Sequence, residues 1–426
     1  MPSFLAMSKE ELKKQKLELN YLYESIKEKN LKLDMSRGKP GADQLNLSME
    51  LLDTLNSSNT CKDKNNFDLR NYGIPDGTAE SRELFASILE VAPENVIVGG
   101  NSSLNMMFDT VAQLMTHGIN GCTPWAKLPK VKFLCPSPGY DRHFAICDYF
   151  NIEMIAVKMT QTGPDMNEIS RLVSEDDTIK GIWCVPKYSN PDGVTYSNET
   201  VKKFAALKPK AKDFRIFWDN AYAVHHLNEK GDVLLNIIEQ CKLNHNDDMP
   251  FVFTSTSKIT FPGAGLATVA TGSANIKWLK SRISMQTIGP DKLNQLRHTE
   301  MFKNADDIAN HMKKHAEILN PKFEAVLSAL NEIKDLCKWN VPNGGYFVSV
   351  NTYDFCAKTV VDLCKQAGVT LTPAGATFPY GKDPKDQNIR IAPTFPPISE
   401  LKEAMELFCL CVKIATVEKL LNKVSY

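Results

Sequence analysis

The 426-residue sequence has no excess of charge of either sign. Lysine plus arginine and aspartate plus glutamate both number 50, so the formal net charge is +0 at pH 7. Proteins that bind nucleic acid or membrane surfaces usually carry a basic excess. We therefore expect neither nucleic acid nor a membrane among the partners of this chain.

Long apolar runs and cysteine motifs are also lacking. There is no run of about 18 apolar residues, the length that crosses a bilayer. The first residues contain too short an apolar stretch for a signal peptide. The 11 cysteines form no CxxC pair and show no metal-ligand spacing. Scattered cysteines in odd number are typical of reduced thiols, so we expect a cytoplasmic protein with no bound metal.

The common nucleotide-binding motifs are missing as well. Neither GxGxxG nor a Walker loop occurs, which disfavours dinucleotides and nucleoside triphosphates as ligands. Instead, the turn at 99–103 (GGNSS) follows a strand-like run, 96–98, and precedes a helical pattern. Free N–H groups at a helix N-terminus favour an anion. Alone this motif is weak, because such a turn is more often only a turn.

The order of elements predicts two regions of different architecture. From about residue 91 to 271, short strands alternate with helices, which is typical of a mainly parallel, doubly wound α/β sheet. After about residue 305, two helices (305–319 and 321–333), short strands and a long helix indicate a smaller α+β domain. We predict an N-terminal arm and part of the small domain at 1–50, a large domain at 51–304, and a small domain at 305–426.

Polar residues follow the predicted strands at the points where the strands end. In a doubly wound sheet, ligands bind beyond the carboxyl ends of the strands. Lys258 is the most informative of these residues, because a desolvated lysine amine readily forms Schiff bases. A lone lysine after a strand is, however, more often a surface residue. The polar residues at the predicted strand ends are Ser102, Ser103, Tyr140, Asn190, Asp219, Tyr222, Ser255, Ser257 and Lys258.

This set of residues suits pyridoxal phosphate (PLP). The cofactor needs a lysine, an acid at the ring nitrogen, donors for the phenolic oxygen, an aromatic face and a phosphate cradle. Each residue alone has a plain structural explanation: Asp219 could cap a turn, Asn190 could begin one, and Tyr140 could be a core aromatic. Suitable residues at successive strand ends are much harder to explain by chance.

Over roughly residues 30–423 the chain resembles the class I/II aminotransferases, which are PLP enzymes of fold type I. It most resembles the divergent bacterial-type aspartate aminotransferases. This resemblance implies a large domain with a mainly parallel, seven-stranded-type sheet and a smaller α+β domain. The resemblance is carried by Ser36–Gly38, Tyr72–Gly73 with Gly77, Gly99–Ser103, Pro138–Tyr140, Asn190–Gly193, Asp219–Tyr222, Ser255–Lys258, Pro342–Phe347 and Asn388–Ala392.

The resemblance also implies roles for the individual residues. Lys258 would form the Schiff base and shuttle the proton, and Asp219 would pair with the ring nitrogen. Arg390 would bind the substrate α-carboxylate as a bidentate pair. The other implied roles are the phenolic oxygen for Asn190 and Tyr222, ring stacking for Tyr140, the phosphate for Ser102, Ser103, Ser255 and Ser257, and close approach of the backbone to the substrate at Gly38. Arg37, beside Gly38, is a candidate for a second substrate carboxylate, and a solvent-facing loop cation is the equally good alternative. Tyr72 would reach the phosphate in the site of a second subunit, which implies a homodimer with shared sites.

One position departs from the family pattern. The family usually has a phosphate-binding arginine about eight residues after the lysine, and here that region reads PGAGL, residues 262–266. Either another cation replaces the arginine, with Lys292 and Arg297 as candidates, or backbone and hydroxyl donors suffice.

The expected activity is transamination, with aspartate or glutamate as donor and 2-oxoglutarate or oxaloacetate as acceptor. Aromatic amino acids or kynurenine are alternatives, because Tyr346, Phe347 and Phe378 could line a permissive pocket. A PLP-dependent β C–S lyase would use the same cofactor residues. A PLP-sensing transcription regulator is disfavoured, since only about 30 residues precede Leu33, too few for a DNA-binding domain. A catalytically inactive scaffold is the remaining alternative.

Overall fold

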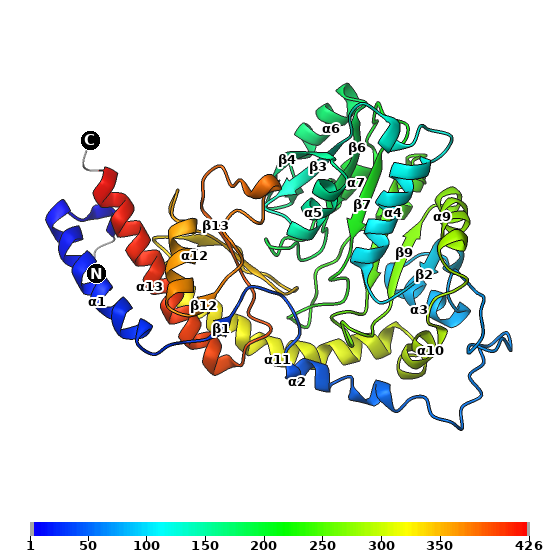
Figure 1. Cartoon of the computed structure of the whole chain (residues 1–426), viewed down its shortest axis with the longest axis horizontal. Coiled ribbons are helices and arrows are strands. Elements are labelled where there is room, and N and C mark those ends of the chain that lie inside the picture. Colours follow the sequence, from blue (N-terminus) through cyan, green and yellow to red (C-terminus); the bar gives the residue numbers. More distant parts are fainter. Residues whose placement is uncertain (1–3, 424–426) are drawn as a thin grey trace.

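The computed structural model describes residues 4–423 and contains one large central sheet. Its eight strands lie in the order β2-β9-β8-β7-β6-β3-β4-β5 (Figure 1). Their bounds are β2 Val96–Val98, β3 Lys132–Ser137, β4 Glu153–Thr160, β5 Gly163–Pro164, β6 Ile179–Cys184, β7 Arg215–Asp219, β8 Pro250–Ser255 and β9 Ala267–Thr271. The mainly parallel sheet is confirmed, with β9 antiparallel to β8 as the expected return. The difference from a seven-stranded sheet is β5, two residues antiparallel to β4.

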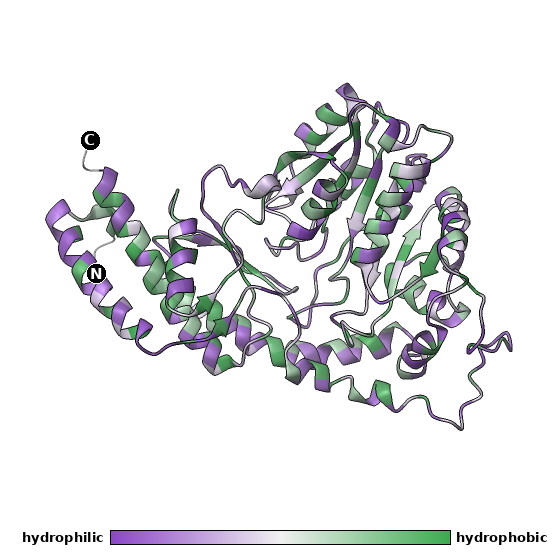
Figure 2. Cartoon of the chain, in the orientation of Figure 1, coloured by the Kyte–Doolittle hydropathy of each residue, from purple (hydrophilic) through white to green (hydrophobic). Residues whose placement is uncertain are grey.

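Helices cover both faces of this sheet, and its middle strands are mostly apolar. Every residue of β6, β7 and β8 is buried, as expected for a parallel sheet packed on both sides. One face packs against α3 (Ala79–Leu89), α6 (Met166–Glu175), α7 (Asn198–Ala205) and α8 (Ile237–Leu243). The other face packs against α4 (Ser103–His117), α5 (Asp141–Tyr149) and α9 (Ser273–Gln286). Figure 2 shows green, apolar strands between helices that are purple on their outer sides.

The second region combines residues from both ends of the chain. A three-stranded antiparallel sheet contains β10 (Lys338–Trp339), β11 (Val348–Asn351) and β13 (Asn388–Ile391). Strand β1 (Leu33–Asp34) pairs in parallel with β12 (Val369–Thr370). The N-terminal segment therefore packs beside the C-terminal third of the chain. The exact domain boundaries stay a prediction.

Helices surround this second sheet and connect it to the first. They are α1 (Lys9–Lys27), α2 (Ala42–Asn46), α12 (Ala357–Gln366) and α13 (Ile398–Lys423), with α10 (Lys292–Met301) and α11 (Ala305–Asn331) leading in from the large sheet. Short 3₁₀ turns lie at η1 Phe4–Ala6, η2 Met49–Leu52, η3 Pro93–Asn95, η4 Trp125–Lys127 and η5 Pro379–Gly381. In Figure 1, α11 runs beneath both regions. None of the helices within residues 4–423 is both long and apolar enough to cross a membrane.

Helix α11 corrects one expectation. The sequence predicts two helices separated near Pro321, whereas the structure has one continuous helix with Pro321 inside it. An interior proline costs about 3 kcal/mol. The apolar residues Leu319, Phe323 and Val326 lie on both sides of the proline and are buried in the same core as α13. Their burial offsets the cost of the proline, at about 1.5–3 kcal/mol for each large side chain.

Candidate active site

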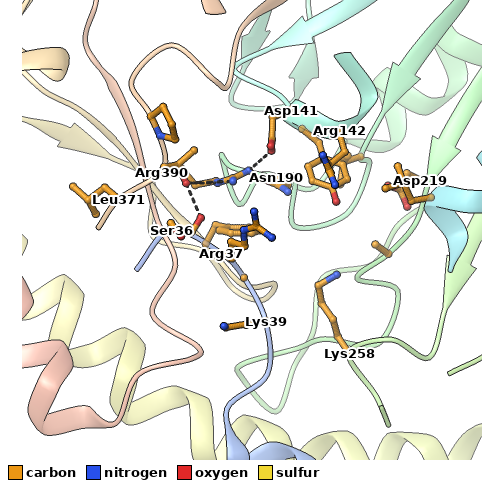
Figure 3. Close-up of a pocket in the computed structure, with 18 of the residues that line it drawn as sticks. Ser36, Arg37, Lys39, Asp141, Arg142, Asn190, Asp219, Lys258, Leu371 and Arg390 are labelled. Carbon is orange, nitrogen blue, oxygen red and sulfur yellow. Dashed lines mark hydrogen bonds and ion pairs between the residues drawn. The ribbon is translucent and has the colours of Figure 1, made fainter. Parts of the chain in front are cut away.

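A cavity of about 840 Å³ lies where the strands of the large sheet end, between that sheet and the second region (Figure 3). Nearly all the site residues expected from the sequence line it. From the large sheet these are Ser102, Ser103, Tyr140, Asn190, Asp219, Tyr222, Ser255, Ser257 and Lys258, and from the second region Arg37, Gly38 and Arg390. Tyr72 is the exception, since it does not line the cavity and its side chain is 76% exposed.

Lys258 extends into the cavity from the turn that follows β8 (Figure 3). Its Nζ lies 5.1 Å from the ring centre of Tyr222 and 5.9 Å from that of Tyr346. Desolvation lowers the pKa of Lys258, and the charge of Asp219 partly counteracts this. An amine with a lowered pKa is neutral more of the time, which is the form that acts as a nucleophile or base.

Tyr346, which lies just before β11, and two histidines of α11 fix the turn that carries this lysine. Tyr346 Oη donates to the carbonyl of Lys258 at 3.4 Å. The next carbonyl, that of Ile259, lies 2.9 Å from His311 Nε2 and 3.1 Å from His315 Nε2. Burial lowers the pKa of His315 to about 4, so this ring is neutral at pH 7. Sequence reasoning missed both histidines, although their four-residue spacing places them on one face of the helix.

Asp219 ends β7 and presents an unpaired oxygen. Its Oδ2 lies 3.0 Å from His143 Nε2, and His143 stacks on Trp183 with ring centres 4.5 Å apart. Oδ1 is buried and has no hydrogen-bond partner among the described residues. Because an unpaired buried acceptor is costly, this oxygen fits a ligand N–H donor. His143 was not predicted, although it follows Tyr140 by three residues.

Serine hydroxyls and a helix N-terminus meet at one end of the cavity. Ser102 caps α4, accepting from the N–H of Asn105 at 3.4 Å. Ser255 Oγ donates to Ser257 Oγ at 3.0 Å, and Ser257 Oγ donates to the carbonyl of Asn101 at 3.3 Å. We call this the hydroxyl end, defined by Ser102, Ser103, Ser255 and Ser257. Free N–H groups and the helix dipole make it suitable for an anion.

No arginine stands at the hydroxyl end where the family pattern has one. Leu266 occupies that position, is 1% exposed and belongs to the core beneath the sheet. Neither of the two suggested replacements lines the cavity. Lys292 Nζ instead lies 3.4 Å from the carbonyl of Pro290. The groups at the hydroxyl end that favour an anion are therefore hydroxyl and N–H donors.

Arg390, on β13, lines the cavity on the side of the second region. Its guanidinium lies 4.8 Å from the ring centre of Phe347 and is bonded on two sides (Figure 3). Nη1 donates to Asp141 Oδ1 at 2.8 Å and to Asn190 Oδ1 at 3.1 Å, whereas Nε and Nη2 both lie 3.3 Å from Thr372 Oγ1. We call this the arginine end, defined by Arg390, Arg37 and Arg142.

Gly38 lies close to Arg390 and has no space for a side chain. A Cβ at this position would be only 2.4 Å from Cζ of Phe347, the ring under the guanidinium. The expected approach of this backbone to the substrate stays a prediction.

Cations outnumber carboxylates in the cavity wall, although the chain as a whole has no net charge. The lining cations are Arg37, Lys39, Arg142, Lys258, Lys358, Lys365 and Arg390, and the lining carboxylates are Asp141, Asp219 and Asp362. Lys358, Asp362 and Lys365 come from α12 at i, i+4 and i+7, so they share one helix face. Sequence reasoning missed this face, because nothing in the α12 pattern says which neighbour it meets.

Comparison with known proteins identifies the family. A model of the family described as aspartate amino-transferase matches residues 7–424. The chain belongs to the aspartate aminotransferase family. This confirms the resemblance inferred from the sequence motifs.

Related aminotransferases match over nearly the whole chain. The aspartate aminotransferase of Corynebacterium glutamicum is 41% identical over 404 residues, covering 94% of this chain and 93% of its own. An aminotransferase of Mycolicibacterium smegmatis is 43% identical over 425 residues, 99% of both chains. The crystal structure of an aspartate transaminase from C. glutamicum superimposes with a TM-score of 0.95 at 40% identity, covering 98% and 99% of the two chains. The chain is thus a PLP-family aminotransferase with the type I fold.

Proposed function

We propose that this aminotransferase moves the amino group of aspartate or glutamate to 2-oxoglutarate or oxaloacetate, with PLP bound at Lys258. The observation that carries the proposal is the joint placement of three groups in one cavity. These are the Lys258 amine with its lowered pKa, the unpaired buried Oδ1 of Asp219, and the Arg390 guanidinium. The name of the C. glutamicum relative supports the substrate.

The residues present fit the cofactor. The unpaired Asp219 oxygen would accept a hydrogen bond from the protonated ring nitrogen, and the hydroxyl end would hold the phosphate. Asn190 and Tyr222 would contact the phenolic oxygen, with Tyr140 stacked on the ring. An α-aminoadipate aminotransferase of Thermus thermophilus with the same fold was solved with N-(5'-phosphopyridoxyl)-L-leucine. When bound, PLP supplies an aldehyde that joins to amines and a ring that withdraws electrons from the substrate Cα.

The chain's own groups would orient the substrate and move its proton. Arg390 would bind the α-carboxylate and so fix which bonds of Cα point toward Lys258. The neutral Lys258 amine would take the Cα proton as a general base and return it later in the half-reaction. The buried rings of Tyr222 and Tyr346 beside Nζ keep water from the amine.

The charge of the cavity wall supports a dicarboxylic substrate. After Arg390 binds one carboxylate, Arg37 could hold a second one, because its side chain lines the cavity and forms no hydrogen bond or ion pair with any residue in 4–423. The aromatic alternative has less support, because Phe347 lines the cavity whereas Tyr346 and Phe378 do not. Hydrophobic substrates would leave the lining cations unpaired.

Substitution of the lysine tests the proposal. We expect Lys258→Ala to lose the absorbance band of bound PLP and transaminase activity. Borohydride reduction of the wild-type holoenzyme should place a pyridoxyl group on Lys258, located by peptide mass spectrometry. Label on another lysine, or activity that survives the substitution, would refute the assignment.

A substrate panel separates the competing activities. Regeneration of the cofactor by 2-oxoglutarate, with aspartate preferred over phenylalanine and kynurenine, is the expected result. Accumulation of pyruvate and ammonia from cysteine conjugates would instead indicate a β C–S lyase.

Exposed Tyr72 supports a homodimer in which it reaches the site of the second subunit. Mixed dimers test this directly, using Tyr72→Ala together with Lys258→Ala. If the sites are shared, one site of the mixed dimer carries both wild-type residues, so mixing two weakly active variants restores activity. Without sharing, mixing gives no gain.

A further inference from the structure

The donors of Arg390 are already occupied in ways that bear on substrate binding. A guanidinium has five N–H donors, two on each Nη and one on Nε. Both donors of Nη1 have acceptors, Asp141 and Asn190, and Nε faces Thr372. A bidentate carboxylate needs parallel N–H groups on two adjacent nitrogens. The two available pairs are Nη1 with Nη2 and Nε with Nη2, and Nη2 also faces Thr372. Each pair therefore includes a donor that is already bonded, and one partner must leave.

Asp141 is the partner that can leave. Thr372 is held in place, since its hydroxyl donates to the carbonyl of Ser36 at 2.7 Å and its side chain is buried. Asn190 is 5% exposed. The side chain of Asp141 is 33% exposed, and Arg390 is its sole hydrogen-bond or ion-pair partner within residues 4–423. It thus has both the freedom and the room to turn away.

Charge gives the reason for it to leave. If Asp141 stayed, the substrate carboxylate and the Asp141 carboxylate would face the same Nη1, and two adjacent like charges disfavour each other strongly. Asp141 is also the first residue of α5, so its carboxylate stays at the positive end of a helix after turning. Arg142, the next residue, lines the same cavity and offers a second cation.

We infer that Asp141 is an internal carboxylate that occupies Arg390 until the α-carboxylate of the substrate displaces it. The inference rests on the proposed function, in which Arg390 binds that carboxylate. Asp141 thereby neutralises the buried guanidinium between turnovers and makes every α-carboxylate ligand compete with an intramolecular anion. It is a positioning residue that sets affinity.

The test is the affinity of the holoenzyme for succinate, a dicarboxylate without an amino group, measured by calorimetry. Asp141→Asn keeps the shape and one acceptor oxygen but removes the competing charge. We expect it to bind succinate about tenfold more tightly, the size of a partly exposed ion pair with a buried guanidinium. The KM for aspartate should fall in step, without a matching rise in kcat.

Asp362→Asn is the matched control, because it removes one carboxylate from the same cavity without touching Arg390. Equal tightening in both variants would show a general charge effect and overturn the inference. Weaker succinate binding in Asp141→Asn would show that Asp141 supports the arginine, and would also overturn it. Asp141→Ser, a favourable residue at a helix start, gives a second reading if the asparagine variant unfolds.

Arg390→Ala separates failure of the inference from failure of the proposed function. If Arg390→Ala weakens succinate binding but Asp141→Asn does not tighten it, only the inference fails. If Arg390→Ala leaves succinate binding unaltered, Arg390 is not the carboxylate site and the proposed function fails with it.

Discussion

The two ends of the cavity present groups that favour anions, and they do so by different physical means. The hydroxyl end uses serine hydroxyls and the first N–H groups of α4, with Leu266 where the family pattern has an arginine. The arginine end uses one buried guanidinium among further cations. Helix N–H groups belong to the backbone and survive every single substitution except one to proline, whereas a guanidinium is lost with one residue. We therefore expect the arginine end to be the more fragile of the two.

Removing the guanidinium is the largest expected perturbation. Arg390→Ala should lower kcat/KM for aspartate about 10²- to 10³-fold, because loss of a buried, hydrogen-bonded charge partner costs about 2–5 kcal/mol. Arg390→Lys should recover little, since an ammonium cannot form the two parallel bonds. PLP affinity, measured by equilibrium dialysis, should stay close to wild type. Loss of PLP in Arg390→Ala would mean that the two ends are not independent.

How well the sequence predicts each end depends on whether the residues that form it lie close together in the sequence. Each half of the hydroxyl end is local: a strand, a Gly-Gly turn and a serine cap lie within eight residues, 96–103, and Ser255 and Ser257 lie at the end of β8 and just after it. Lys258, Asp219 and Asn190 were predictable for the same reason, because each lies at the end of a strand or within six residues after it. The strand ends of a parallel sheet then bring them together without further information.

The arginine end depends on contacts that no local pattern encodes. Asp141 and Arg390 are 249 positions apart, and they meet only because the second region docks over the strand ends. Likewise, the sequences of α12 and α11 alone do not show which helix face packs toward the site, so the two α12 lysines and the α11 histidines were not predicted. Lys292 and Arg297, the two suggested phosphate cations, follow the Gly289-Pro290 turn in the sequence but do not line the cavity.

Restoring the family arginine tests whether the hydroxyl end is complete. Leu266→Arg places a cation at a position that is 1% exposed and packed in the core of the large sheet. We expect the cofactor-free protein to lose about 3 kcal/mol or more of unfolding free energy, as for an uncompensated buried charge. Chemical denaturation with and without PLP measures this. Tighter PLP binding without loss of stability would show that the hydroxyl end lacks a cation it can accommodate.

Single hydroxyl deletions should have smaller effects. Ser255→Ala should weaken PLP binding about 10- to 100-fold, because a hydrogen bond to a charged group contributes about 1.5–3 kcal/mol. The KM for aspartate should change little. Thr372→Ala at the arginine end is the crossed control, expected to raise KM and leave PLP affinity alone. If both variants changed both constants, the division into two ends would fail.

The α12 lysines should give the smallest effect, because they contribute long-range field instead of contacts. Lys358 and Lys365 line the cavity from α12 and add their positive charge to that of the arginine end. Replacing both by glutamine should lower kcat/KM for aspartate a few-fold at low ionic strength, with the difference shrinking as salt screens charges beyond about 10 Å at 0.1 M. Lys14→Gln, on the exposed side of α1, is the matched control for a lost surface charge. A salt-independent loss would instead mean that one lysine contacts the substrate, which would extend the arginine end from a single guanidinium to α12.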